Sequence, residues 1–333
     1  MPETRYDVLG IGNAIVDVLA TIEDDFLVAE NLAKGTMHLI DAARAETLHR
    51  HIPGAIERSG GSAGNTAAGV ASLGGRAAFI GKVADDPLGH LYKSDMADTG
   101  VHFATSPLPK GAPTARSMIL ITPDGERTMN TYLGACQMLG PGDIDPDVVQ
   151  ASAVTYLEGY LWDPPEAKKA FRRAAEIAHA AGRKVSITLS DAFCVDRYRA
   201  EFLDLIRTRT VDILFANDSE VKSLYTTSSL EAAVAAVQQD CALTAVTVGA
   251  DGALVVTPDG VMPVAAAAVE TVADLTGAGD LFAAGFLYAV TRDMSLTDAA
   301  SLGNLAAAEV IGHIGPRPHV ALAELARKSG FAL

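Results

Sequence analysis

The feature that most constrains the fold is a regular alternation of short apolar runs with longer amphipathic segments. Apolar runs of this length are typical of strands buried on both faces of a sheet, and the longer segments have the spacing of helices. The apolar runs are residues 9–12, 77–81, 153–157, 185–189, 211–216 and 243–248. The helical segments are residues 164–181, 217–225, 230–239, 280–290 and 297–311. This order predicts an α/β fold with a mainly parallel sheet and helices on both of its faces.

Two pairs of strand-like runs depart from this alternation, because no crossover helix separates the members of either pair. The runs are residues 15–22, 35–40, 114–122 and 126–133. The second pair flanks Pro123-Asp124-Gly125, in which proline fixes φ and glycine tolerates a positive φ, so it predicts a hairpin. We expect either a small antiparallel sheet that forms a lid, from about residues 15–40 and 105–134, or an extension of the main sheet. Residues 1–333 are expected to form a single domain.

The charge balance and the composition exclude several classes of protein. The 333 residues carry 26 basic and 41 acidic side chains, a net charge of −15, which disfavours binding to nucleic acid or to an anionic membrane surface. The longest apolar stretch, residues 281–290, is shorter than the roughly 20 residues that span a bilayer. Cys136, Cys194 and Cys241 are odd in number and far apart, as expected of free thiols in a reducing compartment. We therefore expect a cytoplasmic protein that binds neither nucleic acid nor membrane.

The common glycine motifs for dinucleotides and for nucleoside triphosphates do not fit this chain. Gly10-Ile11-Gly12 follows a predicted strand, but the third glycine of a dinucleotide fingerprint would fall on Ile15, and a Walker A loop is absent. The run Gly60-Gly61-Ser62-Ala63-Gly64 matches the nucleophile elbow of serine hydrolases. That elbow follows a buried strand, whereas residues 56–59 are too polar for a central strand. A hydrolase with Ser62 as nucleophile is therefore the less favoured interpretation.

Two glycine-rich segments favour a site for phosphoryl transfer when they are interpreted together. In GGSAGNTA, residues 60–67, glycines let a ligand approach the backbone, and the Asn65 amide suits a pair of sugar hydroxyls, although it would also cap a helix. In DLTGAGDLFAAG, residues 274–285, successive backbone N–H groups before a helix form an anion hole. Asp280 beside that anion hole would accept the proton of an attacking hydroxyl in phosphoryl transfer, or would only cap the helix.

The segments GGSAGN and DLTGAGD together resemble the paired motifs of the ribokinase (PfkB) family of carbohydrate and nucleoside kinases. The resemblance extends from about residue 6 to residue 315, and within the family it is strongest to adenosine kinases, on four further segments. These segments are residues 12–17 (GNAIVD), 128–135 (TMNTYLGA), 188–193 (TLSDAF) and 211–220 (VDILFANDSE). The resemblance implies a ribokinase-like three-layer sandwich with a mainly parallel central sheet and a small β-sheet lid. It also implies ATP- and Mg²⁺-dependent phosphorylation of the 5′-hydroxyl of adenosine to give AMP.

The same resemblance implies a role for individual residues. The acceptor-binding residues would be Asn13, Asp17, Gly60, Gly61 and Asn65. The catalytic residues would be Asp280 as general base, Gly277, Ala278 and Gly279 as anion hole, and Arg127 as a phosphate contact. The ATP-binding residues would be Asn217, Thr247, Gly249, Gly252 and Asn304. Glu220 would hold Mg²⁺ through water, and Asp274 and Thr276 match positions that bind K⁺ in some relatives.

Several of these assignments have simpler alternatives. Asn217 and Glu220 fit a helix N-cap with its capping-box partner as well as they fit a metal role. Arg127 could instead form a surface ion pair with an acidic residue of its own turn. Leu275 stands where the family commonly has threonine, which leaves the finer contacts near the nucleotide open. The candidates for a wall against a nucleobase are Tyr160, Leu161, Trp162 and Phe193, although a tryptophan next to Asp163-Pro164 is equally suited to pack at a strand end.

Two other functions also stay open. One is a PfkB-type kinase of a free sugar such as ribose or fructose, which would need more polar partners than the apolar slot for a nucleobase. The other is a nucleoside-binding regulator without catalysis, against which the intact GAGD element argues. The partners implied are a small-molecule acceptor and ATP, and both a monomer and a homodimer are compatible with the sequence.

Overall fold

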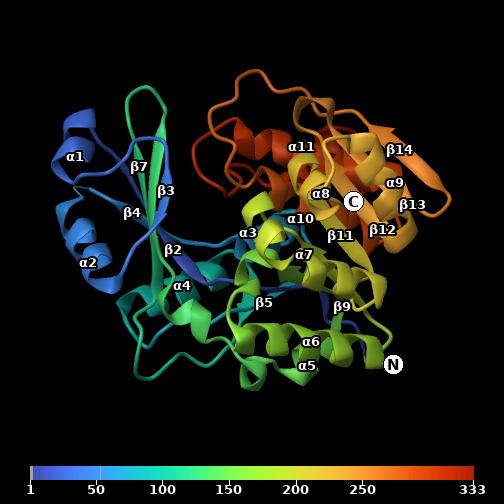
Figure 1. Cartoon of the computed structure of the whole chain (residues 1–333), viewed down its shortest axis with the longest axis horizontal. Coiled ribbons are helices and arrows are strands. Elements are labelled where there is room, and N and C mark those ends of the chain that lie inside the picture. The colour runs from blue at the N-terminus through green and yellow to red at the C-terminus, as the bar shows by residue number, and fades with distance from the viewer. Residues whose placement is uncertain (1–2, 53) are drawn as a thin grey trace.

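The computed structural model, which describes residues 3–52 and 54–333, is built around a nine-stranded sheet (Figure 1). The strand order is β14-β13-β12-β11-β10-β9-β1-β5-β6. The strands are β1 (Tyr6–Ile11), β5 (Ala77–Ile80), β6 (Val101–Phe103), β9 (Ser152–Glu158), β10 (Lys184–Thr188), β11 (Ile213–Asn217), β12 (Leu243–Thr247), β13 (Ala253–Thr257) and β14 (Gly260–Val264). All pairs from β12 to β6 are parallel, and β13 and β14 add an antiparallel edge. The six apolar runs identified in the sequence are therefore confirmed as strands of one mainly parallel sheet.

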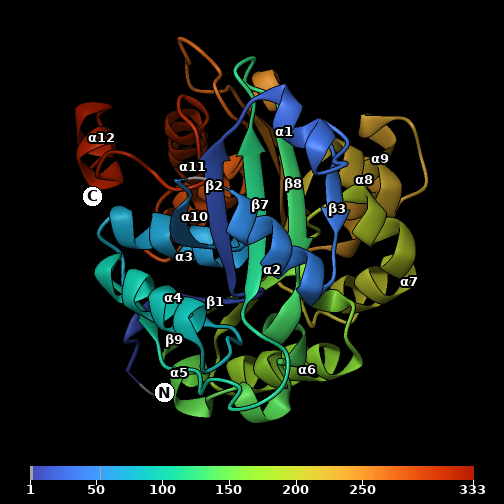
Figure 2. The same ribbon diagram turned by 90° about the vertical axis from the view of Figure 1, so that its left-hand side faces the viewer.

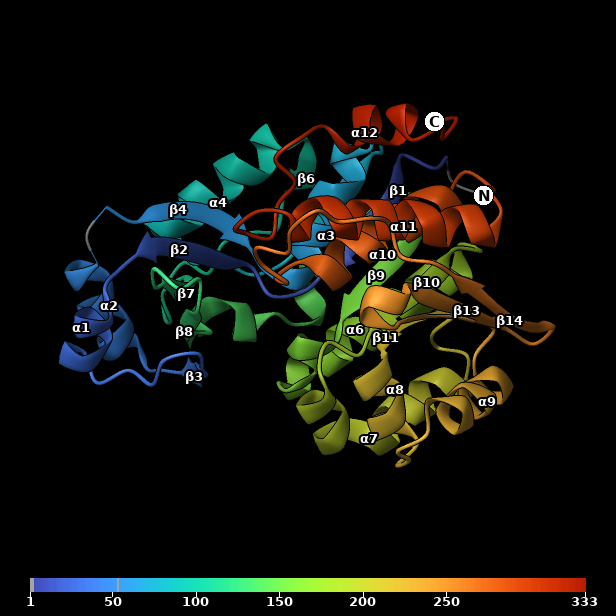
Figure 3. The ribbon, with the colours of Figure 1, turned by 90° about the horizontal axis from the view of Figure 1, so that it is seen from above.

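Helices cover both faces of this sheet, which confirms the predicted three-layer α/β class (Figure 3). One face carries α3 (Ser62–Ser72), α10 (Ala278–Val290), α11 (Leu296–Ile311) and α12 (Leu322–Lys328). The other carries α5 (Pro146–Gln150), α6 (Pro165–Ala180), α7 (Ala192–Arg207), α8 (Asp218–Leu224) and α9 (Leu230–Asp240). Successive residues of β1 enter the two cores in turn, Val8 on the α3 side and Leu9 on the α6 side, because side chains alternate along a strand. Among the described residues, no helix is long and apolar enough to cross a membrane.

A second, five-stranded sheet stands beside the large one, with helices on its outer side (Figure 2). Its order is β3 (Met37–Leu39), β8 (Arg127–Tyr132), β7 (Ala115–Ile121), β2 (Ile15–Thr21) and β4 (Ile56–Gly60). The helices are α1 (Asp24–Ala29) and α2 (Ala42–His51), and α4 (Pro87–Asp98) packs against β4 and β6. The predicted hairpin is confirmed, because β7 and β8 pair antiparallel around a turn in which Gly125 has a φ of 82°.

The small sheet differs from the prediction in three respects, the first being that the helix α1 separates β2 from β3 in the chain. It is mixed and not antiparallel, because β2 pairs with β7, and β3 with β8, in parallel. It also contains β4, which the sequence did not indicate because Glu57 and Arg58 interrupt any apolar run. β4 is an edge strand that keeps Ser59 and Gly60 buried and exposes Ile56, so little apolar surface is needed to hold it.

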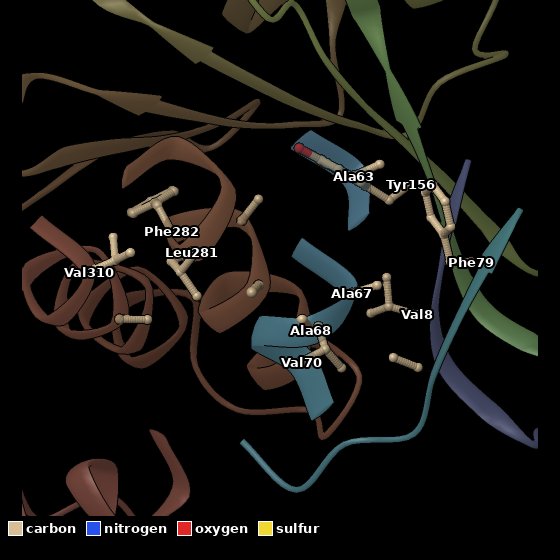
Figure 4. Close-up of a cluster of buried hydrophobic side chains, with 14 of the residues drawn as sticks. Val8, Ala63, Ala67, Ala68, Val70, Phe79, Tyr156, Leu281, Phe282 and Val310 are labelled. Atoms are coloured by element: carbon tan, nitrogen blue, oxygen red, sulfur yellow. The ribbon is translucent and has the colours of Figure 1, made fainter. Parts of the chain in front are cut away.

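Small residues bring α3 and α10 close together over β1 (Figure 4). A Cβ atom on Gly69 of α3 would lie 2.6 Å from the Cβ of Ala284 on α10. The buried cluster around this contact contains Val8, Ala63, Ala67 and Leu281. This packing sets the first turns of α3 and α10 next to each other, although more than 200 residues separate them in the sequence.

Candidate active site

The candidate site lies at the carboxyl ends of the parallel strands. These ends share one edge of the sheet, and β1 has β5 on one side and β9 on the other, so the chain order changes direction there. Open α/β sheets bind ligands at such a switch point. Asn13 follows β1, Glu158 ends β9, Asn217 ends β11 and Thr247 ends β12. The sheet thus delivers four polar side chains to a single edge.

Asp280 lies in the first turn of α10, and the N-cap residue of this helix, Gly277, has a left-handed backbone conformation. Gly277 has a φ of 82°, and a Cβ atom there would lie 2.8 Å from the Cα of Pro316, so only glycine fits. The N–H of Leu281 donates to the carbonyl oxygen of Gly277 at 2.8 Å, whereas the N–H of Ala278 donates to Leu275 at 3.3 Å. The N–H groups of Gly279 and Asp280 therefore stand before the first helical hydrogen bond, at the positive end of the helix.

The carboxylate of Asp280 is held by the first turns of α3. The Ser62 hydroxyl donates to Oδ1 of Asp280 at 2.6 Å, and the Asn65 amide donates to Oδ2 at 2.9 Å. Burial raises the pKa of Asp280, and these two hydrogen bonds and the nearby Arg317 act in the opposite direction. The two glycine-rich segments thus meet in one site. The hydrolase interpretation is not supported, because the Ser62 hydroxyl donates its hydrogen bond to the carboxylate of Asp280, and β4 before it lies in the small sheet and not in the central one.

Gly60 makes room for the side chain of Asp17, and Gly61 makes room for the backbone of Asn13. A Cβ on Gly60 would lie 2.2 Å from Oδ2 of Asp17, and one on Gly61, whose φ is 85°, would lie 2.1 Å from the carbonyl oxygen of Asn13. Asp17 is buried on β2, and burial raises its pKa to about 7 even though Arg317 lowers it. Asn13, Asp17, Gly60, Gly61 and Asn65 are therefore brought together on one side of Asp280, and we call this set the acceptor wall.

Glu158 is a site residue that the sequence reasoning missed. Its side chain is 1% exposed and accepts hydrogen bonds from the Asn13 amide at 2.6 Å, the Asn13 N–H at 3.3 Å and the Ala63 N–H at 2.9 Å. Burial raises the pKa of Glu158 to about 7. The signal was an acidic residue directly after the apolar run 153–157, where a buried strand reaches the edge of the sheet.

Arg317 is the second residue that was missed. Its Nε donates to Oδ1 of Asn65 at 2.8 Å, and its Nη2 donates to the carbonyl oxygen of Ser59 at 3.0 Å. Arg317 lies in the irregular segment between α11 and α12, where no periodic pattern or motif distinguishes it from its neighbours. It faces both carboxylates of the site, since its charge lowers the pKa of Asp17 and of Asp280.

Arg127 forms an ion pair with the buried Asp274 rather than a surface pair within its turn. Its Nη1 donates to Oδ2 of Asp274 at 2.7 Å, and its Nη2 contacts Oδ1. Asp274 also accepts the N–H of Thr276 on Oδ1 at 2.7 Å and the N–H of Gly315 on Oδ2 at 2.9 Å. Asp124, the alternative partner in the turn, pairs with Lys34. Both oxygens of Asp274 are thus engaged by N–H donors, and its charge is neutralised by a guanidinium.

The residues expected on the nucleotide side occupy the neighbouring strand ends. Asn217 and Glu220 form the complete capping box of α8, with the Asn217 amide also donating to Oε1 of Glu220 at 2.6 Å. Burial raises the pKa of Glu220 to about 7. Thr247 ends β12, and Gly249 and Gly252 bound the short turn η4 (Gly249–Asp251) that follows.

Asn304 and the aromatic candidates occupy different environments. Asn304, on α11, donates to the carbonyl oxygen of Ala265 at 2.8 Å and so fixes the segment that follows β14. Leu161 and Trp162 do not form a wall for a base, because both are fully buried and Trp162 packs against Phe171 and Phe202 in the core. Phe193, which is 80% exposed at the start of α7, and the partly exposed Tyr160 after β9 are free of that core.

Comparisons with known proteins find a family and solved structures that this chain resembles. A family model described as pfkB family carbohydrate kinase matches residues 31–321. An adenosine kinase from Sinorhizobium meliloti has a solved structure with 58% sequence identity and a TM-score of 0.90, covering 98% of this chain and 100% of that one. A probable sugar kinase from Rhizobium etli CFN 42 has 54% identity and a TM-score of 0.91, covering 98% and 99%. A probable fructokinase-2 of Arabidopsis thaliana is 29% identical over 256 residues, which are 74% of this chain and 76% of that protein.

Proposed function

Because the chain belongs to the pfkB family of carbohydrate kinases, we propose that it transfers the γ-phosphoryl group of ATP to the 5′-hydroxyl of adenosine. The observation that carries the proposal is the position of Asp280, hydrogen-bonded to Ser62 and Asn65 beside the acceptor wall. The choice of a nucleoside is supported by the adenosine kinase that shares 58% of its sequence across nearly the whole chain.

The acceptor wall suits the hydroxyls of a ribose. The two oxygens of Asp17 would accept hydrogen bonds from neighbouring hydroxyls, and Asn13 and Asn65 each offer an amide. Glu158 fixes the Asn13 amide by accepting from it at 2.6 Å, so the loop after β1 is held before the acceptor binds. Gly60 and Gly61 keep this wall open, because any side chain there would occupy the space of Asp17 or Asn13.

Asp280 would act as the general base for the 5′-hydroxyl. It would take the hydroxyl proton as the oxygen–phosphorus bond forms and the bond between the γ-phosphorus and ADP breaks. A pKa raised by burial makes its carboxylate a better proton acceptor than an exposed aspartate. The anion hole of Gly277, Ala278 and Gly279 would lie against the transferred group, with the N–H of Gly279 unused by the helix. Arg127 would contact the phosphates with donors that Asp274 does not engage, and its ion pair with Asp274 holds it at the same loop.

ATP would lie along the strand ends that carry Asn217, Thr247, Gly249 and Gly252, with Asn304 behind them. In the described ranges there is no cluster of three or more histidine, cysteine, aspartate or glutamate side chains of the kind that holds a metal ion. Mg²⁺ fits such a site if phosphate oxygens and water supply most of its ligands, which is its usual mode. Each oxygen of Glu220 accepts one hydrogen bond from Asn217, so Glu220 would contact waters of the ion only with its remaining lone pairs. When bound, Mg²⁺ neutralises charge on the phosphates. The carboxylate of Asp274 does not fit K⁺, because Arg127 and the backbone N–H groups of Thr276 and Gly315 already engage both of its oxygens.

The small sheet would act as the lid. It contributes Asp17 on β2 and Arg127 on β8, so it takes part in both the acceptor wall and the anion-hole loop. A kinase that admits water hydrolyses ATP, so closure of this sheet over the bound acceptor would exclude water and complete the site. The three buried free cysteines also support the proposal of a cytoplasmic location.

A free sugar is the second candidate acceptor, because one similar protein is described as a probable fructokinase and one similar solved structure as a probable sugar kinase. The test is a coupled assay of ADP release with adenosine, other nucleosides, ribose and fructose. We expect kcat/KM for adenosine to exceed that for fructose by at least about 100-fold, since a base pocket adds binding energy that a hexose cannot use. The matched control is 5′-deoxyadenosine, which lacks only the accepting hydroxyl and should release no ADP above background. Comparable rates with fructose and adenosine would overturn the nucleoside assignment.

A further inference from the structure

We propose that Arg317 is a positioning residue for Asp280, which it controls through the amide of Asn65. This inference rests on the proposed role of Asp280 as the base. Three groups form a chain: the Arg317 guanidinium donates to Oδ1 of Asn65 at 2.8 Å, and Nδ2 of Asn65 donates to Oδ2 of Asp280 at 2.9 Å. Arg317 lies 37 positions after Asp280 in the chain and outside both glycine-rich segments.

The chain of contacts fixes which way the Asn65 amide faces. An arginine side chain has donors only, so the group that it contacts on Asn65 must be the oxygen. The amide nitrogen is then turned toward Asp280, to which it donates. Without Arg317, the oxygen of Asn65 loses its donor and the amide is held only by the carboxylate that it positions, so one of the two hydrogen bonds that hold the base is no longer fixed in direction. The other, from Ser62, leaves Asp280 free to turn about that contact.

Arg317 is itself held on both sides, as a positioning residue must be. Its Nη2 donates to the carbonyl oxygen of Ser59 at 3.0 Å and to the Ser59 hydroxyl at 3.1 Å. Two residues earlier, the N–H of Gly315 donates to Asp274, and two residues later, the N–H of His319 donates to Glu309 at 2.9 Å. The segment between α11 and α12 is thus fastened to the anion-hole loop, to α11 and to β4, so the guanidinium has little freedom to move.

The charge of Arg317 also favours the ionised form of Asp280, which is the form that can accept a proton. Burial raises the pKa of Asp280, and Arg317 is the cation that opposes this effect. The other titratable groups that face Asp280 are Asp17 from β2, Glu158 and Tyr156 from β9, and Tyr160 from the turn after β9. None of these is a cation, so removing Arg317 leaves the base with no charge partner among them.

The test compares the pH dependence of kcat in three variants, using whichever acceptor the wild-type protein phosphorylates best. For Arg317→Met we expect kcat to fall by about 10- to 100-fold and its acid limb to move to higher pH, with KM for ATP little changed. Arg317→Lys keeps the charge but loses the fixed fork, so its acid limb should return toward the wild-type position while kcat recovers only in part. Ser59→Ala is the matched control: it removes one anchor of Arg317 and should leave the acid limb in place.

The outcomes separate this inference from the proposed function. A uniformly lower kcat in Arg317→Met with an unshifted acid limb, or an unchanged kcat, would overturn the positioning role. Should Arg317→Met fail to fold, Arg317→Lys decides alone: a wild-type kcat and profile contradict the role, and a reduced kcat with a near wild-type acid limb supports it. If Asp280→Asn retains full activity, the base assignment itself fails, and this result is distinct from an unshifted limb in a protein that needs Asp280.

Discussion

Replacing Glu158 by glutamine should change how the stability of the protein depends on pH. In the wild-type protein the carboxylate of Glu158 is 1% exposed, and three N–H donors from Asn13 and Ala63 contact it. Burial dominates over these contacts and raises its pKa from 4.5 to about 7. The folded protein therefore binds a proton at Glu158 more tightly than the unfolded chain does.

The magnitude follows from that shift. A group whose pKa is raised on folding contributes stability that is present below the unfolded pKa and is lost as the pH rises through the folded pKa. At about 1.4 kcal/mol per pKa unit, the shift of Glu158 amounts to about 3 kcal/mol, lost between about pH 4.5 and pH 7. Glutamine does not titrate, so the variant lacks this loss. The free energy of unfolding of Glu158→Gln, minus that of the wild type, should therefore rise by about 3 kcal/mol across this range.

Urea unfolding followed by circular dichroism at pH 4.5, 6 and 8 measures this difference. The raised pKa values of Asp17, Glu220 and Asp280 affect both proteins, so their contributions largely cancel. Thr155→Val, a buried change on the same strand, is the control, and its effect should be the same at every pH because neither residue titrates. A difference between Glu158→Gln and wild type that stays constant or falls with rising pH would refute the reasoning.

Two further predictions concern the loops of the site. Gly61→Ala should raise KM for the acceptor by at least about tenfold and leave KM for ATP unchanged, because its Cβ would lie 2.1 Å from the Asn13 carbonyl oxygen. Gly142→Ala, with no atom near its Cβ, is the matched control, and an unchanged acceptor KM in Gly61→Ala would contradict the acceptor wall. Replacing KCl by choline chloride should leave kcat of the wild-type protein unchanged, since Arg127 already neutralises Asp274. Strong and selective stimulation by K⁺ would contradict that account.

Much of the large sheet could be predicted from the sequence because its strands are buried on both faces. A run such as residues 153–157 has to be apolar to lie between two helical layers, and this requirement can be recognised in the sequence. β4 was missed because an edge strand of the small sheet needs only Ser59 and Gly60 buried, and its remaining residues are as polar as those of a loop. The parallel pairing of β2 with β7 could not be predicted either, since it depends on which strands the folded chain brings together.

In the candidate site too, the sequence predicted the residues that belong to a local pattern and missed those that depend on contacts between distant segments. Gly277 and Asp280 were identified because a left-handed glycine and a helix N-terminus impose a local pattern of residues. The Arg127–Asp274 pair joins residues 147 positions apart, and no local pattern distinguishes it from a surface pair at the turn. Arg317 lies in an irregular segment, and its position beside Asn65 depends on the path that the folded chain takes after α11. The sequence left Trp162 between a ligand wall and packing at a strand end, because an aromatic residue after a strand suits both, and the structure buries it in the core.

The account depends on Asp280 serving an alcohol that is bound by the N-terminal third of the chain. The most direct measurement is kcat of Asp280→Asn beside the affinity of the same variant for ATP, measured by calorimetry. The account predicts that kcat falls by about 10²- to 10⁴-fold, the range for loss of a general base, while the affinity for ATP stays close to that of the wild type. Turnover by Asp280→Asn at the wild-type rate would contradict it.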